Sequence, residues 1–295
     1  RMVPSGTNAE KIISSESLKL QVEFITDTTF KGRSTGSRGA AEAALWISRR
    51  YESAGLMPFD GSWSLSFKVD SLVGRNILGF LPGKRDKVKE MYTIICAHYD
   101  SHGVIDGNLY PGADNNASGV VAMLSIAQMF QKMKELGRSY GKNIIFVATD
   151  AKERNSAGAE ALMEYIRDGR LKDPVNGETI TMEKIHSTVV LDILGSTLAP
   201  LHEDRKDYLI MLSGGQYTFD FTRANEGKGL GLDIATSYYG SKGFTEMFHS
   251  RFGDQKIFVQ NGLTCIVFTS GITLLTNKIG DTADTLDYEV LRKRI

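Results

Sequence analysis

The sequence predicts a single α/β domain, built on a mixed and mainly parallel sheet with helices on both faces. Apolar runs of strand length alternate along the chain with amphipathic runs of helical length, which is the pattern of strand–helix–strand units. Polar residues follow directly where several apolar runs end, and in such sheets the ligand crevice lies beyond the carboxyl ends of the strands. No internal repeat or low-complexity linker divides the 295 residues, so one domain is the simpler interpretation.

The first part of the chain is predicted to contain two helices and two strands. Residues 1–31 are expected to form a helical segment, with the helix within residues 10–31, that packs on an α/β domain of residues 32–295. A second helix is predicted over residues 40–55, because apolar residues recur there at helical spacing and Gly55 suits the end of a helix. Strands are predicted at residues 63–69 and 76–80.

The rest of the chain alternates regularly between strands and helices. Strands are predicted at residues 92–97, 143–149, 187–194, 208–212 and 265–269, and helices at residues 117–133, at residues 156–170 and from residue 287 onward.

Composition excludes some classes of partner. Lys plus Arg equals Asp plus Glu, at 35 each, so no net field recruits nucleic acid or an anionic membrane surface. No apolar run approaches the ~18 residues of a membrane span, and the start shows no hydrophobic core of a signal peptide. Cys96 and Cys265 lie in apolar runs, where cysteines are most often small buried hydrophobes. They form no metal motif, and they leave open both a disulfide between them and the cellular compartment.

Polar side chains stand at the ends of several predicted strands. His98 and Asp100 follow the first strand of the regular part, Asp114 lies in the loop before the next helix, Glu153 follows the strand at 143–149, and Asp192 follows the strand at 187–191. A lone His at a strand end is usually a hydrogen-bonded surface residue, and a lone Asp before a helix is usually an N-cap. Separate elements that deliver an imidazole and carboxylates to one edge of the sheet favour a metal site instead, with Asp100 placed to orient the imidazole.

Three motifs in order resemble the zinc exopeptidases of metallopeptidase family 28, which include secreted bacterial aminopeptidases and glutaminyl cyclase relatives. His98-Tyr99-Asp100-Ser101 is similar to HxDS, the segment at 112–119 resembles GADDNASG, and Leu191-Asp192-Ile193-Leu194-Gly195 resembles NLDMIG. The resemblance covers residue 75 to the end and implies the zinc-exopeptidase fold. It also implies that His98, Asp114 and Asp192 form a first zinc site, with Asp114 as the bridging ligand, and that the protein is exported.

The second half of the motif set departs from the family pattern. The family's Glu-Glu pair, a general base followed by a ligand of the second zinc, is Lys152-Glu153 here, so Glu153 keeps the ligand position and Lys152 takes that of the base. The family's SDHxxF corresponds to a segment at 253–258 that has no His. The last His ligand of YHTxxDT falls on Asn277, or on Gly280 in a shifted register.

These substitutions predict a weakened metal centre. Peptide hydrolysis on this scaffold needs a carboxylate to take a proton from metal-bound water. The side chain of Lys152 is a cation that the neighbouring carboxylates keep protonated, so it cannot do this. We therefore expect one zinc ion at most, or none. We also expect an aminopeptidase-like protein that binds a peptide or another small ligand with an amino group and hydrolyses little of it.

Several alternatives stand beside this expectation. The protein could be an active single-metal peptidase or a glutaminyl-cyclase-like acyl transferase, or a scaffold domain that acts through a partner-binding surface. Lys152 could point to solvent while Asp150 or Glu246 takes the role of the base. The replacement ligand could come from His249 or His102. Tyr238 and Tyr239 belong to a loop that either lines the pocket or is an ordinary turn.

Overall fold

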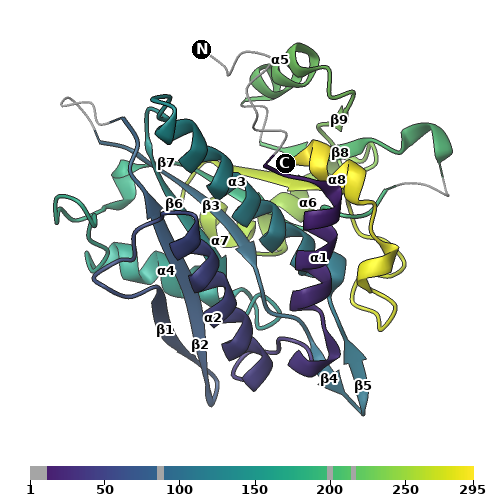
Figure 1. The fold of residues 1–295 in the computed structure, drawn as a ribbon, viewed down its shortest axis with the longest axis horizontal. Coiled ribbons are helices and arrows are strands. Elements are labelled where there is room, and N and C mark those ends of the chain that lie inside the picture. Colours follow the sequence, from purple (N-terminus) through teal and green to yellow (C-terminus); the bar gives the residue numbers. More distant parts are fainter. Residues whose placement is uncertain (1–11, 85–89, 198–201, 214–216) are drawn as a thin grey trace.

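A large twisted sheet forms the centre of the molecule (Figure 1). The computed structural model describes residues 12–84, 90–197, 202–213 and 217–295. The sheet has eight strands in the order β1-β2-β6-β3-β7-β10-β8-β9. Their bounds are Ser64–Val69 for β1, Leu72–Leu81 for β2, Tyr92–His98 for β3, Asn143–Thr149 for β6, Ile185–Leu191 for β7, Tyr208–Leu212 for β8, Asp233–Ala235 for β9 and Cys265–Thr269 for β10.

The middle of the sheet is parallel and its margins are mixed. β3 runs parallel to both of its neighbours, β6 and β7, and β7 runs parallel to β10. β1, β2 and β6 are joined by antiparallel pairings, as are β10 and β8. Every residue of β3 and β6 is buried, which is typical of parallel strands covered on both faces. The prediction of one α/β domain with a mixed, mainly parallel sheet is confirmed.

Helices cover both faces of the sheet (Figure 1). One apolar core joins the sheet to α1 (Ser15–Ile25), α2 (Arg38–Ser53), α3 (Ser118–Glu135) and α8 (Tyr288–Arg294). The other joins it to α4 (Ala157–Arg167), α6 (Lys242–Arg251) and α7 (Gln255–Gln260). Side-chain caps define several helix starts: Ser14, Ser37 and Asp287 each accept a hydrogen bond from a backbone N–H of the first turn of α1, α2 and α8.

Some elements differ from the sequence prediction. The first helix covers only Ser15–Ile25 and a short 3-10 turn follows at Thr28–Phe30; α1 packs against α8 and α3. Several further elements had not been predicted: the hairpin of β4 (Gly103–Ile105) and β5 (Asn108–Tyr110), helix α5 (Thr218–Lys228), the short strand β9, and helices α6 and α7. α5 buries none of its residues, so its sequence carries no apolar face that would have announced a helix.

Within the ranges given above, no helix is long and apolar enough to cross a membrane. Cys96 and Cys265 are both buried free thiols.

Candidate functional site

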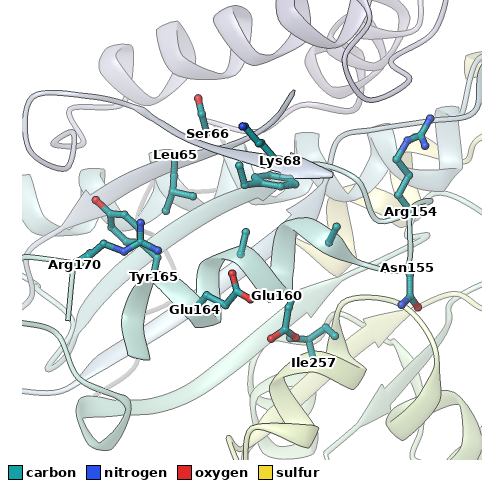
Figure 2. Close-up of a pocket in the computed structure, with 13 residues that line it drawn as sticks. Leu65, Ser66, Lys68, Arg154, Asn155, Glu160, Glu164, Tyr165, Arg170 and Ile257 are labelled. Carbon is teal, nitrogen blue, oxygen red and sulfur yellow. The ribbon is translucent and has the colours of Figure 1, made fainter. Parts of the chain in front are cut away.

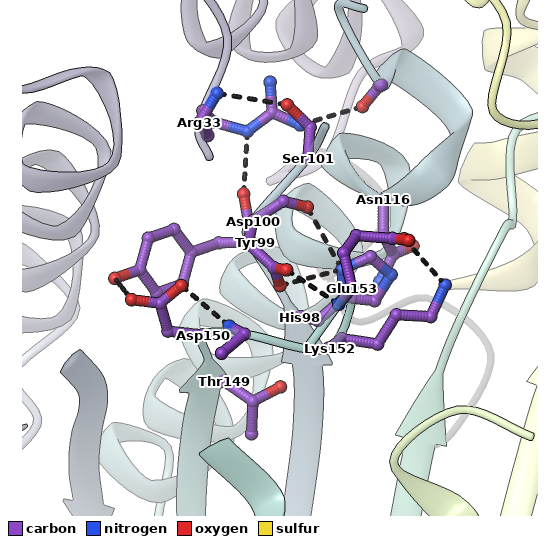
Figure 3. Close-up of polar contacts among 12 residues, drawn as sticks. Arg33, His98, Tyr99, Asp100, Ser101, Asn116, Thr149, Asp150, Lys152 and Glu153 are labelled. Carbon is purple, nitrogen blue, oxygen red and sulfur yellow. Dashed lines mark hydrogen bonds and ion pairs between the residues drawn. The ribbon is translucent and has the colours of Figure 1, made fainter. Parts of the chain in front are cut away.

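The parallel middle of the sheet brings several predicted site residues to one edge. β6, β3 and β7 are neighbours that run in the same direction, so their carboxyl ends meet. His98 is the last residue of β3, Asp192 follows β7, and Lys152 and Glu153 lie in the turn after β6. Figure 3 shows His98, Asp100, Lys152 and Glu153 gathered there.

The imidazole of His98 lies between two carboxylates and one amide. Its Nδ1 is 3.3 Å from Oδ1 of Asp100, and its Nε2 is 3.3 Å from Oδ1 of Asp192 and 3.1 Å from Oδ1 of Asn115. Burial and the charge of Lys152 lower the pKa of His98, but the carboxylates of Asp100 and Asp192 outweigh both and raise it to about 10. The two carboxylates therefore favour the protonated, imidazolium form of His98.

Lys152 supplies the second cation of the cluster. Its Nζ lies 3.0 Å from Oε1 of Glu153, and its side chain is 17% exposed. Burial lowers the pKa of Lys152, yet the charges of Asp192 and Glu153 more than compensate and raise it above its ordinary value. The other carboxylate oxygen of Glu153 is 3.5 Å from Nε2 of His102. Lys152 thus turns into the cluster and stays charged, and it does not point to solvent.

Asn115 is the residue that the sequence interpretation missed. Besides facing His98, its amide nitrogen donates to Oδ1 of Asn277, so two amides in contact with each other stand beside His98. A signal was present in the motif, because GADDNASG carries two consecutive acids where this chain has Asp114 and then Asn115. Carbonyl oxygens of amides are weaker zinc ligands than imidazole or carboxylate.

Asp114 does not turn toward His98, although the resemblance implies a bridging role for it. Its Oδ1 accepts hydrogen bonds from the backbone N–H of Gly195 at 2.6 Å and from the hydroxyl of Ser118 at 3.0 Å. Its Oδ2 accepts from the hydroxyl of Ser196. The carboxylate of Asp114 therefore fastens the loop after β7 to the start of α3. The loop at 113–115 is held in turn by Asp281, which accepts from the backbone N–H groups of Asp114 and Asn115 at 2.7 and 3.0 Å.

The residues of the cluster do not fit the zinc ion that the resemblance implies. Protein zinc sites use at least three His, Cys, Asp or Glu ligands, and among the residues that the structure describes only Asp192 adds such a donor around Nε2 of His98. Across the part of the chain that the structure describes, no group of three or more of these residues is arranged to hold a metal ion. The reason is chemical: an amide stands at Asn115 and an ammonium at Lys152, where further anionic donors would be needed.

A buried arginine holds the backbone on either side of the cluster by hydrogen bonds. Arg33 has no exposed surface, and its guanidinium donates to the carbonyl group of Tyr99 at 2.8 Å (Figure 3). It also donates to the carbonyl groups of Pro111 at 2.7 Å and Gly112 at 2.9 Å. A fourth bond goes to the carbonyl of Ile25 at the end of α1. Arg33 therefore joins the end of β3, the loop that precedes Asn115 and the N-terminal helix.

The other candidates of the sequence analysis have different surroundings. Asp150 accepts from Thr35, from the backbone of Arg75 and from Tyr99. Glu246 is exposed on α6. Tyr238 is buried in an aromatic cluster with Tyr239, Phe244 and Phe248, and Nε2 of His249 lies 3.0 Å from the carbonyl oxygen of Cys265.

Little open space remains at the cluster. The hollow beside Asn115, Glu153 and Asn277 has a volume of about 10 Å³. A single water molecule needs roughly this much space. This hollow is too small for a peptide unless the side chains that line it move.

The sequence is similar to known proteins. Residues 76–294 match the sequence profile of Peptidase family M28. Among similar proteins, the BOS complex subunit ncln of Danio rerio is 28% identical over 178 residues, which cover 60% of this chain and 29% of that protein. The chain thus matches less than a third of the length of this relative.

Solved structures share the fold at low identity. The LapA aminopeptidase of Legionella pneumophila superposes with a TM-score of 0.70 at 15% identity, covering 97% of this chain and 70% of that one. BSAP, a zinc aminopeptidase from Bacillus subtilis, superposes with a TM-score of 0.65 at 13% identity, covering 95% and 92%. At these identities the likeness establishes the α/β fold and leaves the chemistry to be argued from the residues.

Proposed function

The chain belongs to peptidase family M28, and from this premise we propose that its ancestral centre no longer supports metal-dependent peptide hydrolysis. Cationic side chains of the protein itself neutralise the carboxylates that a pair of metal ions would otherwise neutralise. The observation that carries the proposal is the Lys152 ammonium, 3.0 Å from Glu153 and mostly buried. Both groups are residues of the chain, so the neutralisation needs no bound ion.

The chemistry of hydrolysis is blocked at two points. An ammonium at residue 152 has no lone pair to take a proton from water, and losing a general base typically lowers a rate ~10²–10⁴-fold. Amides at Asn115 and Asn277 provide weak donors where the cluster would need anionic or imidazole ligands. Zinc belongs to structural neighbours of this chain, and we propose that this chain holds one equivalent at most.

The ligand side of the proposal follows from the same charges. The amino terminus of a peptide is a cation, like the side chain of Lys152, and would compete with it for Glu153 and Asp192. Binding of a peptide amino group therefore requires Lys152 to move aside and the hollow of about 10 Å³ to widen. We propose weak binding of amino groups with little turnover, by a protein that is exported from the cytoplasm.

The test uses the unmodified protein, purified without chelators. Elemental analysis should find one zinc or none per chain, and assays with aminoacyl amides and with an amino-terminal glutamine peptide should give rates at the background level. Robust hydrolysis that a chelator abolishes would overturn the proposal. Cyclisation of the glutamine peptide would favour the acyl-transferase alternative.

A further inference from the structure

A groove runs between the edge strand β1 and helix α4 (Figure 2). Its volume is about 560 Å³, and a hollow of about 190 Å³ continues it along β1, sharing Leu65, Ser66, Tyr165 and Arg170. It has no lining residue in common with the hollow of about 10 Å³ at the cluster. The groove therefore offers the space for a ligand that the ancestral centre lacks.

Small residues on both walls leave part of the groove open. Helix α4 presents Ala157 and Ala161 to it, and these residues lie on the same face of the helix. On the other wall the ring of Phe67 lies across Gly74 of β2, where a Cβ atom would stand 2.3 Å from the ring. Phe67 can lie flat only because residue 74 is glycine, and the space that its ring would otherwise fill stays free.

The strand that borders the groove has a free edge. In the described part of the chain, β1 pairs only with β2. The N–H of Leu78 donates to the carbonyl of Trp63 at 2.8 Å, which fixes the alternation of hydrogen-bonded pairs along the two strands. By that alternation the backbone groups of Ser64, Ser66 and Lys68 point away from β2.

Part of this edge is already occupied. The hydroxyl of Ser62 contacts both the N–H and the carbonyl of Ser64, at 3.1 Å each. The N–H and carbonyl groups of Ser66 and Lys68 have no partner among the described residues. Two residues of β1, spaced as alternate positions of a strand, are thus ready to pair with an added strand.

The directions and charges of the side chains around the groove indicate which peptide side chains would suit it. Leu65 points toward α4, whereas Ser66 and Lys68 point away from it (Figure 2). On the α4 wall Glu160 pairs with Arg167 at 2.9 Å, while Glu164 is exposed and has no partner among the described residues. An added strand would therefore meet a mixed surface on the groove side, with apolar side chains such as Leu65 and Phe67 and the free anion of Glu164, and the Lys68 cation on the other side.

We propose that this groove binds an extended peptide segment of another protein, which pairs with the backbone of Ser66 and Lys68 as an additional strand. Its side chains alternate in direction. Those that enter the groove are apolar against Phe67 and basic beside Glu164. The side chains that face away are acidic or polar beside Lys68.

The probe is a capped peptide with the core Val-Glu-Lys-Glu-Val, compared with a charge-reversed Val-Lys-Glu-Lys-Val peptide and with a copy methylated on alternate backbone nitrogens. Isothermal titration calorimetry should show saturable binding of the first peptide only. Ser66→Pro removes one outward N–H that β1 does not use for pairing with β2, and it should weaken binding about tenfold, whereas Ser66→Thr keeps the N–H and should bind normally. Ala161→Trp fills the groove and should abolish binding.

Further variants separate this site from others. Glu164→Lys should reverse the preference between the two charged peptides, and the exposed Glu226→Lys on α5 is its matched control. The capped peptide has no amino terminus to compete with Lys152 at the His98 cluster, so this result and the outcome of the hydrolysis assays are independent. No saturable binding up to ~1 mM, or binding that survives both Ser66→Pro and Ala161→Trp, would overturn the proposal. A dimer in sedimentation that Ser66→Pro dissociates would make a second copy of the chain the occupant and would also overturn it.

Discussion

The ammonium of Lys152 lies 3.0 Å from Oε1 of Glu153, the next residue in the chain, and both side chains are less than one-fifth exposed. Such an ion pair exists at a cost in lost hydration, and it is tolerated because Asp192 and Asp100 add further negative charge around the ammonium. The pair therefore stabilises the folded state mainly by preventing uncompensated charge.

The first prediction concerns the pair itself. Lys152→Met should lower the free energy of unfolding by about 3 kcal/mol, because it leaves Glu153 and its neighbours as buried anions without their cation. Lys152→Arg keeps the charge and should cost clearly less. The double variant Lys152→Met with Glu153→Gln should recover part of the loss. Urea unfolding measures all three, and a loss within ±0.5 kcal/mol for Lys152→Met would show that the pair is solvated.

The second prediction is that the metal centre can be rebuilt only by several changes together. Lys152→Glu alone should leave zinc uptake and hydrolysis near the background, because amides still stand at Asn115 and Asn277. Adding Asn277→His and Asn115→Asp supplies an imidazole and a carboxylate next to His98, and should increase both zinc uptake and hydrolysis of aminoacyl amides. Elemental analysis and a steady-state assay provide the readouts, and His98→Ala in the rebuilt protein should remove both gains. Full activity in the single Lys152→Glu variant would contradict the prediction.

The fold was predictable from sequence to a large extent, and the reasons are visible in particular elements. β6, β8 and β10 begin and end where the apolar runs do, because strands buried on both faces leave little choice of residue. α5 and α6 were not predicted, since α5 buries nothing and α6 buries only Phe248.

The candidate site was only partly predictable. The site lies at the edge of the sheet where the carboxyl ends of the parallel strands meet. His98 and Asp192 come together there because β3 and β7 are neighbours. The orientation of Asp114 depends on donors at Gly195 and Ser196, which lie far away in sequence and close in space. The motif marks Asn115 as a departure from the family, but this departure alone does not tell which residue of the Asp114–Asn115 pair faces His98.

The third prediction tests the buried guanidinium. Arg33→Met would leave the carbonyl groups of Tyr99, Pro111 and Gly112 without their donor, and each unsatisfied buried group costs about 1–3 kcal/mol. We expect a total loss of about 3–5 kcal/mol in the free energy of unfolding. Arg38→Met is the control, because its side chain is 91% exposed and its helical pair with Glu42 contributes only about 0.3–0.5 kcal/mol. Equal effects of the two substitutions would refute the supporting role of Arg33.

The fourth prediction concerns the pH dependence of stability. Burial, and next the charge of Asp100, raise the pKa of Asp150 to about 6, although Thr35 and two backbone N–H groups oppose the shift. A carboxyl whose pKa is higher in the folded state binds its proton more tightly there, so the unfolded chain releases more protons between about pH 4 and pH 6. Asp150 therefore lowers the free energy of unfolding as the pH rises through this window, and its full cost is present above about pH 6. Asp150→Asn cannot titrate, so the stability of the wild type minus that of the variant should fall by roughly 2 kcal/mol between pH 4 and pH 7. Urea unfolding across this range measures the difference, and one that stays constant or grows with pH would show that Asp150 is ionised at low cost in the folded protein.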